Sequence, residues 1–122
     1  MENHIYSFEK ISIWVDIREL NKMVYTQTTS FPDHEKFGLV SQMRRASISI
    51  GSNLAEGSTR TGSKDQAHFY QIAYSSSIEL LSQLVVSNDL NFITIEDYNH
   101  VRNQIEKISY KLNSLRKAAL HR

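Results

Sequence analysis

One segment of the sequence has the residue types of a phosphate-binding loop. Its glycines are Gly57 and Gly62, and it ends in Ser63 and Lys64, so it reads G-x-x-x-x-G-S-K. In the nucleotide-binding motif the Lys comes before the hydroxyl residue, and a strand precedes the loop. Here the last two positions are exchanged, and the preceding residues have the periodicity of a helix. We therefore interpret Gly57 as the stop of one helix and Ser63 as the start of the next, and we predict no nucleotide site.

Two acid–histidine pairs have the spacing of metal ligands on a helix. Asp65 lies three residues before His68, and Asp97 lies three residues before His100. Carboxylate and imidazole groups at this spacing bind metal in di-iron bundles. Each pair lies in the first turn of its own predicted helix, and antiparallel helices put those turns about 30 Å apart. The two pairs cannot share an ion, so we predict neither a metal nor a cofactor.

Glu56 is the best single candidate for an acid or base in an enzyme. It lies near the negative end of a helix dipole, so it needs a cationic partner such as Arg60. The sequence has no G-x-S-x-G nucleophile motif and no cysteine. We therefore expect no enzymatic activity, and small-molecule chemistry by Glu56 is the third alternative among the functions.

The apolar residues recur at helical spacing along the chain. Four glycines and one proline in 122 residues leave few places to turn. Tyr98 to Ala119 form a strict heptad seam, which is typical of helices that cross at a shallow angle. The pattern predicts helices over about 8–27, 33–56, 64–87 and 95–119. Because the connections are short, we expect an all-α, antiparallel, up-down-up-down four-helix bundle that forms one domain over 1–122.

Composition excludes several classes of protein. With 40% hydrophobic and 22% charged residues, the chain is not a disordered polymer, and without cysteine it has no disulfide or thiol chemistry. The start has no apolar region of a signal peptide, and no apolar run approaches the length of a membrane span. We expect a cytoplasmic protein that does not enter a membrane.

The charges are distributed unevenly, although the formal net charge is only +1. Residues 36–64 hold five Lys or Arg and one acid, and residues 98–122 hold six Lys or Arg and one acid. Residues 1–35 hold three Lys or Arg and six acids, and residues 65–97 hold no Lys or Arg and five acids. The second and fourth helices are therefore basic, and we expect oppositely charged flanks. Three interpretations stay open: complementary neighbouring helices, a head-to-tail oligomer, or a basic strip that faces phosphates.

The second and third helices carry a set of residues that resembles a known family. In the second helix the set is Phe31-Pro32-x-x-Glu35, Gly38-Leu39, Gln42-x-Arg44-Arg45-Ala46, Ser49-Ile50 and Asn53-Leu54-Ala55-Glu56-Gly57. In the third it is Phe69, Ile72-Ala73, Ser76, Glu79-Leu80 and Gln83-Leu84. These residues, with Trp14 in the first helix, resemble the four-helix bundle family of proteins encoded in 23S ribosomal RNA intervening sequences. The sequence departs from the family pattern at Gly51, where proline is common, and at Tyr74-Ser75, where a glycine usually precedes the serine.

The resemblance implies a bacterial, left-handed bundle that assembles as a cyclic homopentamer. It also implies a relation to the accessory variability protein of diversity-generating retroelements, a basic pentamer that partners a reverse transcriptase and nucleic acid. No enzymatic activity belongs to the family. The motif residues carry over as positions only, and whether they serve assembly, stability or binding stays open: Arg44, Arg45, Asn53, Glu56 and Gly57.

The leading hypothesis is a non-catalytic oligomeric bundle that acts as an RNA- or nucleoprotein-associated adaptor. The alternative is a purely structural self-assembly protein without nucleic-acid binding. The candidate nucleic-acid-binding residues are Arg44, Arg45, Arg60, Lys64, Lys111, Arg116 and Lys117. We further expect Asn53 and Glu56 to be buried against the third helix or a neighbouring subunit, with Arg44 or Arg45 as charge partners.

Overall fold

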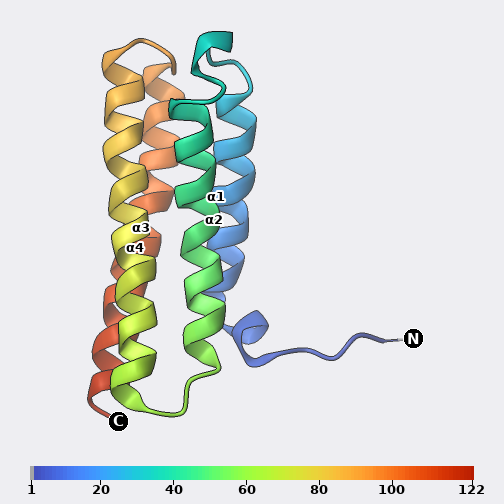
Figure 1. Ribbon diagram of the computed structural model, residues 1–122, viewed down its shortest axis with the longest axis vertical. Coiled ribbons are helices and arrows are strands. Elements are labelled where there is room, and N and C mark those ends of the chain that lie inside the picture. The colour runs from blue at the N-terminus through green and yellow to red at the C-terminus, as the bar shows by residue number, and fades with distance from the viewer. Residues whose placement is uncertain (1) are drawn as a thin grey trace.

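The computed structural model describes residues 2–122 as four long helices with no strand among them. The helices are α1 (Ser12–Thr28), α2 (Leu39–Ser58), α3 (Ser63–Asp89) and α4 (Ile95–Leu120), with short 3-10 helices η1 (Ser7–Lys10) and η2 (Asp33–Glu35). The four lie along one axis, and each runs opposite to the one before it (Figure 1). Helices α1 and α3 each contact both α2 and α4, so they occupy opposite corners. The predicted all-α four-helix bundle is confirmed.

The apolar stripes of the four helices meet in one continuous core. The side chains that are completely buried include Ile17, Leu20, Ile50, Leu54, Leu80, Leu84, Ile105, Ile108 and Leu112. Full burial of one such side chain contributes about 1.5 to 3 kcal/mol. The heptad seam of α4 faces this core over its whole length, from Tyr98 to Ala119. Within residues 2–122, no helix combines the length and apolar character that crossing a bilayer requires.

The predicted start of the second helix at residue 33 is wrong, because α2 begins at Leu39. Residues 33–35 form the separate turn η2, and Gly38 has φ −109° and ψ −110°, outside the helical region. The carboxylate of Glu35 accepts a hydrogen bond from the Leu39 amide at 3.1 Å, which satisfies one free donor of the first turn of α2. The first helix likewise begins at Ser12 and not at residue 8, because residues 7–10 form η1.

Two residues that were predicted to end or begin a helix do not have that role in the structure. Gly57 does not stop α2, which continues to Ser58, and no glycine in residues 2–122 has a positive φ. The N-cap of α3 is Gly62, whereas Ser63 is the first helical residue and makes no capping bond. The start of α4 is as expected, since the Thr94 hydroxyl accepts a hydrogen bond from the Asp97 amide at 3.1 Å.

Gly57 instead permits α2 and α3 to approach closely. It is buried, and a Cβ atom placed on it would lie 2.7 Å from Cε1 of Tyr70 and 3.0 Å from Cβ of Phe69. Its carbonyl oxygen accepts a hydrogen bond from Nε2 of Gln66 at 3.0 Å. The glycine therefore fixes the spacing between the end of α2 and the first turns of α3.

Candidate functional site

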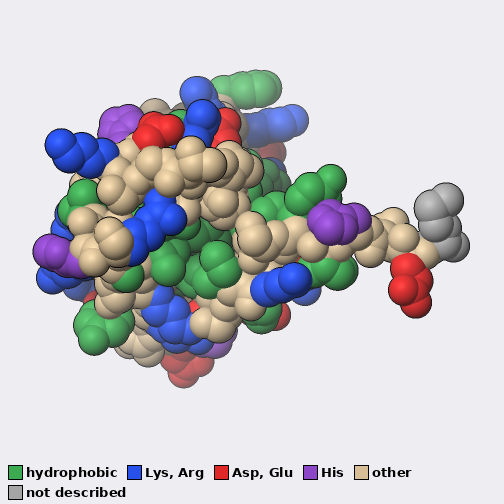
Figure 2. Space-filling model, turned by 90° about the horizontal axis from the view of Figure 1, so that it is seen from below, with side chains coloured by type: hydrophobic (Ala, Val, Ile, Leu, Met, Phe, Trp, Pro, Cys, Tyr) green, Lys and Arg blue, Asp and Glu red, His purple; other side chains and the backbone are tan. Residues whose placement is uncertain are grey.

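The charges of the bundle separate along its long axis. At the end where α2 stops, α3 starts and α4 stops, five cations outnumber the acids Glu56 and Asp65, and we call this the basic end: Arg60, Lys64, Arg116, Lys117 and Arg122. At the other end five acids outnumber the cation Lys36, namely Asp33, Glu35, Asp89, Glu96 and Asp97. Figure 2 looks onto the basic end, where Lys and Arg side chains lie around and across the surface. The two ends therefore differ in charge, because α4 carries Glu96 and Asp97 in its first turn and Lys117 in its last turn, and the expected charged flanks stay a prediction.

Contacts hold several basic residues at this end in place. Nη2 of Arg122 donates a hydrogen bond to the Thr61 carbonyl at 3.2 Å, which joins the end of α4 to the α2–α3 loop. Nε of Arg60 lies 3.8 Å from the Asp65 carboxylate, and its guanidinium lies 4.5 Å from the centre of the Phe69 ring. Glu56 is not the partner of Arg60.

The remaining cations of the basic end differ in how much charge they present to solvent. Lys64 and Lys117 are exposed, and neither forms an ion pair within residues 2–122. Arg116 is half-buried and donates from Nη2 to Oδ1 of Asn113 at 3.0 Å. Its Nε is buried and donates to no acceptor in the described chain. Lys64 and Lys117 are therefore the cations most available to an anionic partner.

Lys111 lies in an ion-pair cluster between α1 and α4. Its Nζ lies 2.6 Å from Oδ2 of Asp16, and Nζ of Lys107 lies 3.4 Å from Oδ1 of the same carboxylate. Burial of Asp16 acts to raise its pKa, but hydrogen bonds from Lys111 and Lys107 and their charges outweigh burial, so the pKa of Asp16 lies below its ordinary value. Most of the charge of Lys111 is thus compensated within the chain, and its predicted role in nucleic-acid binding has less support than that of Lys117.

Arg44 joins α2 to the end of α1. Its Nε donates to the Thr28 hydroxyl at 3.0 Å, and its Nη2 donates to the Tyr25 carbonyl at 3.4 Å. Its guanidinium also lies 4.7 Å from the centre of the Tyr25 ring. A cation here is favourable because the last carbonyls of a helix carry partial negative charge. The guanidinium of Arg44 therefore contacts α1, and Arg44 is not the expected charge partner of Asn53 or Glu56.

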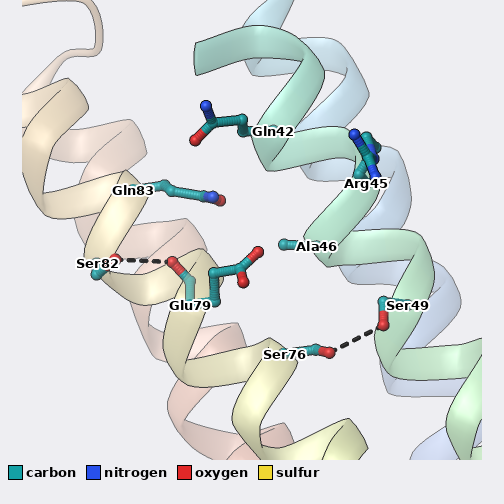
Figure 3. A pocket seen from close by; sticks show the side chains of 8 residues that line it. All are labelled: Gln42, Arg45, Ala46, Ser49, Ser76, Glu79, Ser82 and Gln83. Atoms are coloured by element: carbon teal, nitrogen blue, oxygen red, sulfur yellow. Dashed lines mark hydrogen bonds between the residues drawn. The ribbon is translucent and has the colours of Figure 1, made fainter. Parts of the chain in front are cut away.

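Between α2 and α3 lies a polar groove of about 680 Å³. Its lining comprises Gln42, Arg45, Ala46 and Ser49 from α2 and Ser76, Glu79, Ser82 and Gln83 from α3. Figure 3 shows Glu79 and Gln83 reaching from α3 toward α2, where Ala46 presents only a methyl group. At one end of the groove the hydroxyls of Ser49 and Ser76 are hydrogen-bonded to each other at 2.9 Å.

Of the polar pair expected to be buried, Asn53 is half-buried and its hydrogen bonds stay within α2, on the residue that bonds α3. Its Nδ2 donates to the Ser49 carbonyl at 2.9 Å and lies 3.1 Å from the Ser49 hydroxyl, which in turn bonds Ser76. Glu56 is exposed and makes no hydrogen bond or ion pair through its carboxylate within residues 2–122, so its expected burial against the third helix is wrong, while burial against a neighbouring subunit stays a prediction. The reason is geometric, since the last turn of α2 directs Gly57 toward α3.

Gln83 is the polar residue of this region that the sequence patterns did not single out for a function. It is 9% exposed, and its Oε1 is buried and accepts no hydrogen bond from residues 2–122. Its position between the buried Leu80 and Leu84 was the available signal, because a polar residue inside an apolar stripe is unusual.

A second, more apolar hollow of about 640 Å³ lies on the other side of α2. We call it the apolar hollow, and its exposed apolar side chains are Tyr25, Phe37 and Ile48. Phe37 is 89% exposed. Arg45 and Ser49 line both this hollow and the polar groove, so the two lie against opposite sides of one stretch of α2.

The acid–histidine pairs form no larger cluster. In the described part of the chain, no group of three or more His, Asp or Glu residues is arranged to hold a metal ion. Asp65 faces Arg60, and the backbone of Asp97 belongs to the cap of α4.

Comparison with known proteins identifies relatives of the whole bundle. The family described as 23S rRNA-intervening sequence protein matches residues 9–114. A crystal structure of a protein of unknown function from the S23 ribosomal protein family of Bacteroides thetaiotaomicron is 23% identical in sequence. It superposes with a TM-score of 0.78 over 86% of this chain and 98% of the other, which shows that the fold is shared. No curated protein matches the chain.

Proposed function

Since the chain belongs to the family of 23S rRNA-intervening sequence proteins, we propose that it is a cytoplasmic, non-catalytic, oligomeric adaptor that binds RNA with the basic end of its bundle. The observation that carries this proposal is the separation of charge along the axis. Lys64 and Lys117 are exposed at one end, while the acids of α4 lie at the other. Cations gathered on one surface attract phosphates by a mechanism that does not depend on base sequence.

Self-association would strengthen such binding. The apolar hollow exposes Phe37 together with Tyr25 and Ile48, and exposed apolar clusters of this kind commonly mark protein contacts. A closed ring repeats the basic end in every subunit, which raises avidity without new contacts. The family resemblance implies a ring of five. Light scattering should then give about five times the 14.1 kDa chain mass, and a monomer at micromolar concentration would contradict an oligomer.

The test of RNA binding is a fluorescence anisotropy titration of a structured RNA at several salt concentrations. Wild-type affinity should fall linearly with salt on logarithmic axes, with a slope of roughly 0.7 to 0.9 for each phosphate neutralised. Lys64→Glu and Lys117→Glu should each reduce the affinity and flatten the slope. Lys22→Glu makes the same change of charge on an exposed position of α1 away from the basic end, and it is the matched control.

The outcomes separate this proposal from its alternatives. If the wild type shows no salt-dependent binding even at low ionic strength, the purely structural assembly protein is favoured, because the apolar hollow supports assembly without RNA. If the protein binds but Lys22→Glu weakens binding as much as Lys117→Glu, RNA lies elsewhere on the bundle. Arg45, Arg60 and Arg116 then become the next positions to reverse, and Lys111→Glu is expected to act mainly by breaking its ion pair with Asp16.

A further inference from the structure

The chain carries an apolar segment that stands off its own bundle. Residues 2–6, which we call the arm, extend away from the four helices (Figures 1 and 2). Ile5 and Tyr6 in the arm are 53% and 60% exposed, although both are large apolar side chains. Removing such surface from water is favourable, and clusters of it commonly mark contacts with another protein. The helices of its own bundle leave these two side chains uncovered.

The base of the arm is fixed to the side of the bundle that α1 and α2 form. The Glu9 carboxylate accepts a hydrogen bond from the Tyr6 amide at 2.8 Å, which closes the turn η1. The centre of the Phe8 ring lies 4.9 Å from that of Trp14, and Trp14 packs on α2, where a Cβ atom placed on Gly51 would lie 3.0 Å from its ring. The arm therefore leaves from the α1–α2 side, which is also the side of the apolar hollow.

A third hollow, of about 410 Å³, lies on another side of α1, between α1 and α4, and we call it the α1–α4 groove. The one charged residue that lines it is Lys111, whose Nζ lies 2.6 Å from the Asp16 carboxylate. Small-molecule sites have volumes of roughly 300 to 1,000 Å³, so this groove admits a few side chains and not a whole helix. Tyr110 is 76% exposed at its edge. The apolar side chains of the lining are Ile11, Ile13, Tyr110, Leu115 and Ala118.

The arm and the α1–α4 groove match in height, reach and charge. Ile11 and Ile13 line the groove and directly follow η1, so the groove lies at the level of the bundle axis at which the arm leaves. Five extended residues span about 17 Å, more than the roughly 10 to 12 Å diameter of a helix with its side chains. Residues 2–9 hold two acids and no Lys or Arg, whereas residues 98–122, which include most of α4, hold six Lys or Arg and one acid. The arm of one bundle can therefore reach and complement this groove on a bundle beside it.

We propose that the arm of each chain docks in the α1–α4 groove of a neighbouring copy, where Ile5 and Tyr6 cover its apolar side chains. This inference rests on the proposed oligomer and names the segment that joins its subunits. The arm and the groove lie on different sides of α1, so the contact is head-to-tail, and a head-to-tail contact whose rotation closes forms a ring. The apolar hollow lies on the same side as the arm, so a neighbour that receives the arm also approaches the hollow.

Chemical cross-linking tests this contact directly, because the natural chain has no cysteine. Ile5→Cys in one chain and Ser114→Cys in a second, tagged chain place one thiol on the arm and one at the groove. After the two chains are refolded together, a short bismaleimide should join them into a mixed dimer on a denaturing gel, without the strict geometry that a disulfide requires. Ile95→Cys replaces Ser114→Cys in the matched control, because Ile95 is exposed on the same helix at the opposite end, and it should give no mixed dimer.

Both cysteines in one chain test the other occupant of the groove, which is the arm of the same chain. A link within one chain leaves a monomer on the denaturing gel that has lost both free thiols. That product, without mixed dimers from separate chains, would overturn the proposal.

Substitutions test whether the contact holds the oligomer together. Ile5→Ser combined with Tyr6→Ser, and Tyr110→Ser alone, should each raise at least about tenfold the protein concentration at which light scattering shows half-assembly. Leu90→Ser combined with Ile95→Ser removes two exposed apolar side chains at the other end and should leave that concentration unchanged. All of these positions are exposed, and circular dichroism establishes that each variant is folded.

The outcomes separate the arm from the oligomer itself. An oligomeric wild type that gives no mixed dimers would overturn docking of the arm and leave the proposed oligomer in place. A monomeric wild type without mixed dimers would overturn both, while the salt titration still tests RNA binding. Mixed dimers from a chain that scatters as a monomer would support docking of the arm as a weak contact and overturn the closed ring.

Discussion

Replacing Gly57 by alanine tests whether the glycine is required for helix packing or merely tolerated. The added Cβ would lie 2.7 Å from Cε1 of Tyr70 and 3.0 Å from Cβ of Phe69. Tyr70 is 4% exposed, so its ring has no free space to enter, and Cβ of Phe69 moves only with the backbone of α3. The substitution must therefore push α2 and α3 apart or shift a buried ring.

Two opposing contributions set the size of the effect. Alanine is better than glycine inside a helix by about 1 kcal/mol. Overpacking of a filled core costs typically 1 to 3 kcal/mol, and occasionally more. Because the contact is shorter than real Cβ contacts and both neighbours are held, we expect the upper part of that range. The net loss of unfolding free energy is then about 1 to 2 kcal/mol, and the melting temperature should fall by roughly 3 to 6 °C per kcal/mol.

Thermal and urea denaturation followed by circular dichroism measure this loss. Gly62→Ala is the matched control, because the nearest atom to its added Cβ would be Cβ of Asp65 at 4.0 Å, and its φ of −80° suits any residue. Glycine is a better N-cap than alanine, so we expect this control to cost about 0.5 to 1 kcal/mol through the cap alone, without any coupling to Tyr70.

A double-mutant cycle assigns the cost to the named ring. In a Tyr70→Leu background, which removes the aromatic ring, Gly57→Ala should cost less than in the wild type, and the coupling should be about 0.5 to 3 kcal/mol. If Gly57→Ala is as stable as the wild type, or if the cycle shows no coupling, close packing against Tyr70 is not the reason for the glycine.

Three other substitutions test polar side chains. Asp16→Asn should cost about 1 kcal/mol at neutral pH by breaking the ion pairs with Lys107 and Lys111. The lowered pKa of Asp16 means that this stability is complete above the unfolded pKa of about 4 and is lost as pH falls through the folded pKa. Urea midpoints at pH 7 and near pH 2 should therefore differ less for Asp16→Asn than for the wild type. Asn53→Ala should lower the urea midpoint, whereas Glu56→Ala should leave it unchanged because that side chain is exposed and unpaired in residues 2–122.

The helices were predictable because their apolar periodicity is strong. The heptad seam from Tyr98 to Ala119 predicted a helix over 95–119, and α4 extends from Ile95 to Leu120. The start of α2 was not predictable from Pro32 alone, since proline suits both the first turn of a helix and an isolated turn. The structure uses the second option, and the Glu35 carboxylate, which the pattern assigned to the first turn of the helix, instead accepts from the Leu39 amide from outside the helix.

The site was predictable only in its residue types. Charge summed over whole helices gave basic and acidic helices, but it lost the position of each charge along the axis, and that position places Lys64 and Lys117 at the same end of the bundle. Counting charges by half-helix in an antiparallel bundle would have revealed the basic end. The unpaired Oε1 of Gln83 could not be predicted, because satisfaction of a single buried atom depends on the rotation and spacing of α2 and α3.

Arg45 links the two surfaces on either side of α2, and this makes one further outcome decisive. It lines both the polar groove and the apolar hollow that we assign to self-association. If subunits meet over the apolar hollow, Arg45 is partly covered in the oligomer and is then less available to RNA than Lys64 and Lys117. Phe37→Ser, which removes the most exposed apolar side chain, should then lower the mass measured by light scattering and uncover Arg45. A Phe37→Ser variant that keeps the mass of the wild-type oligomer would show that the apolar hollow is not the contact between subunits.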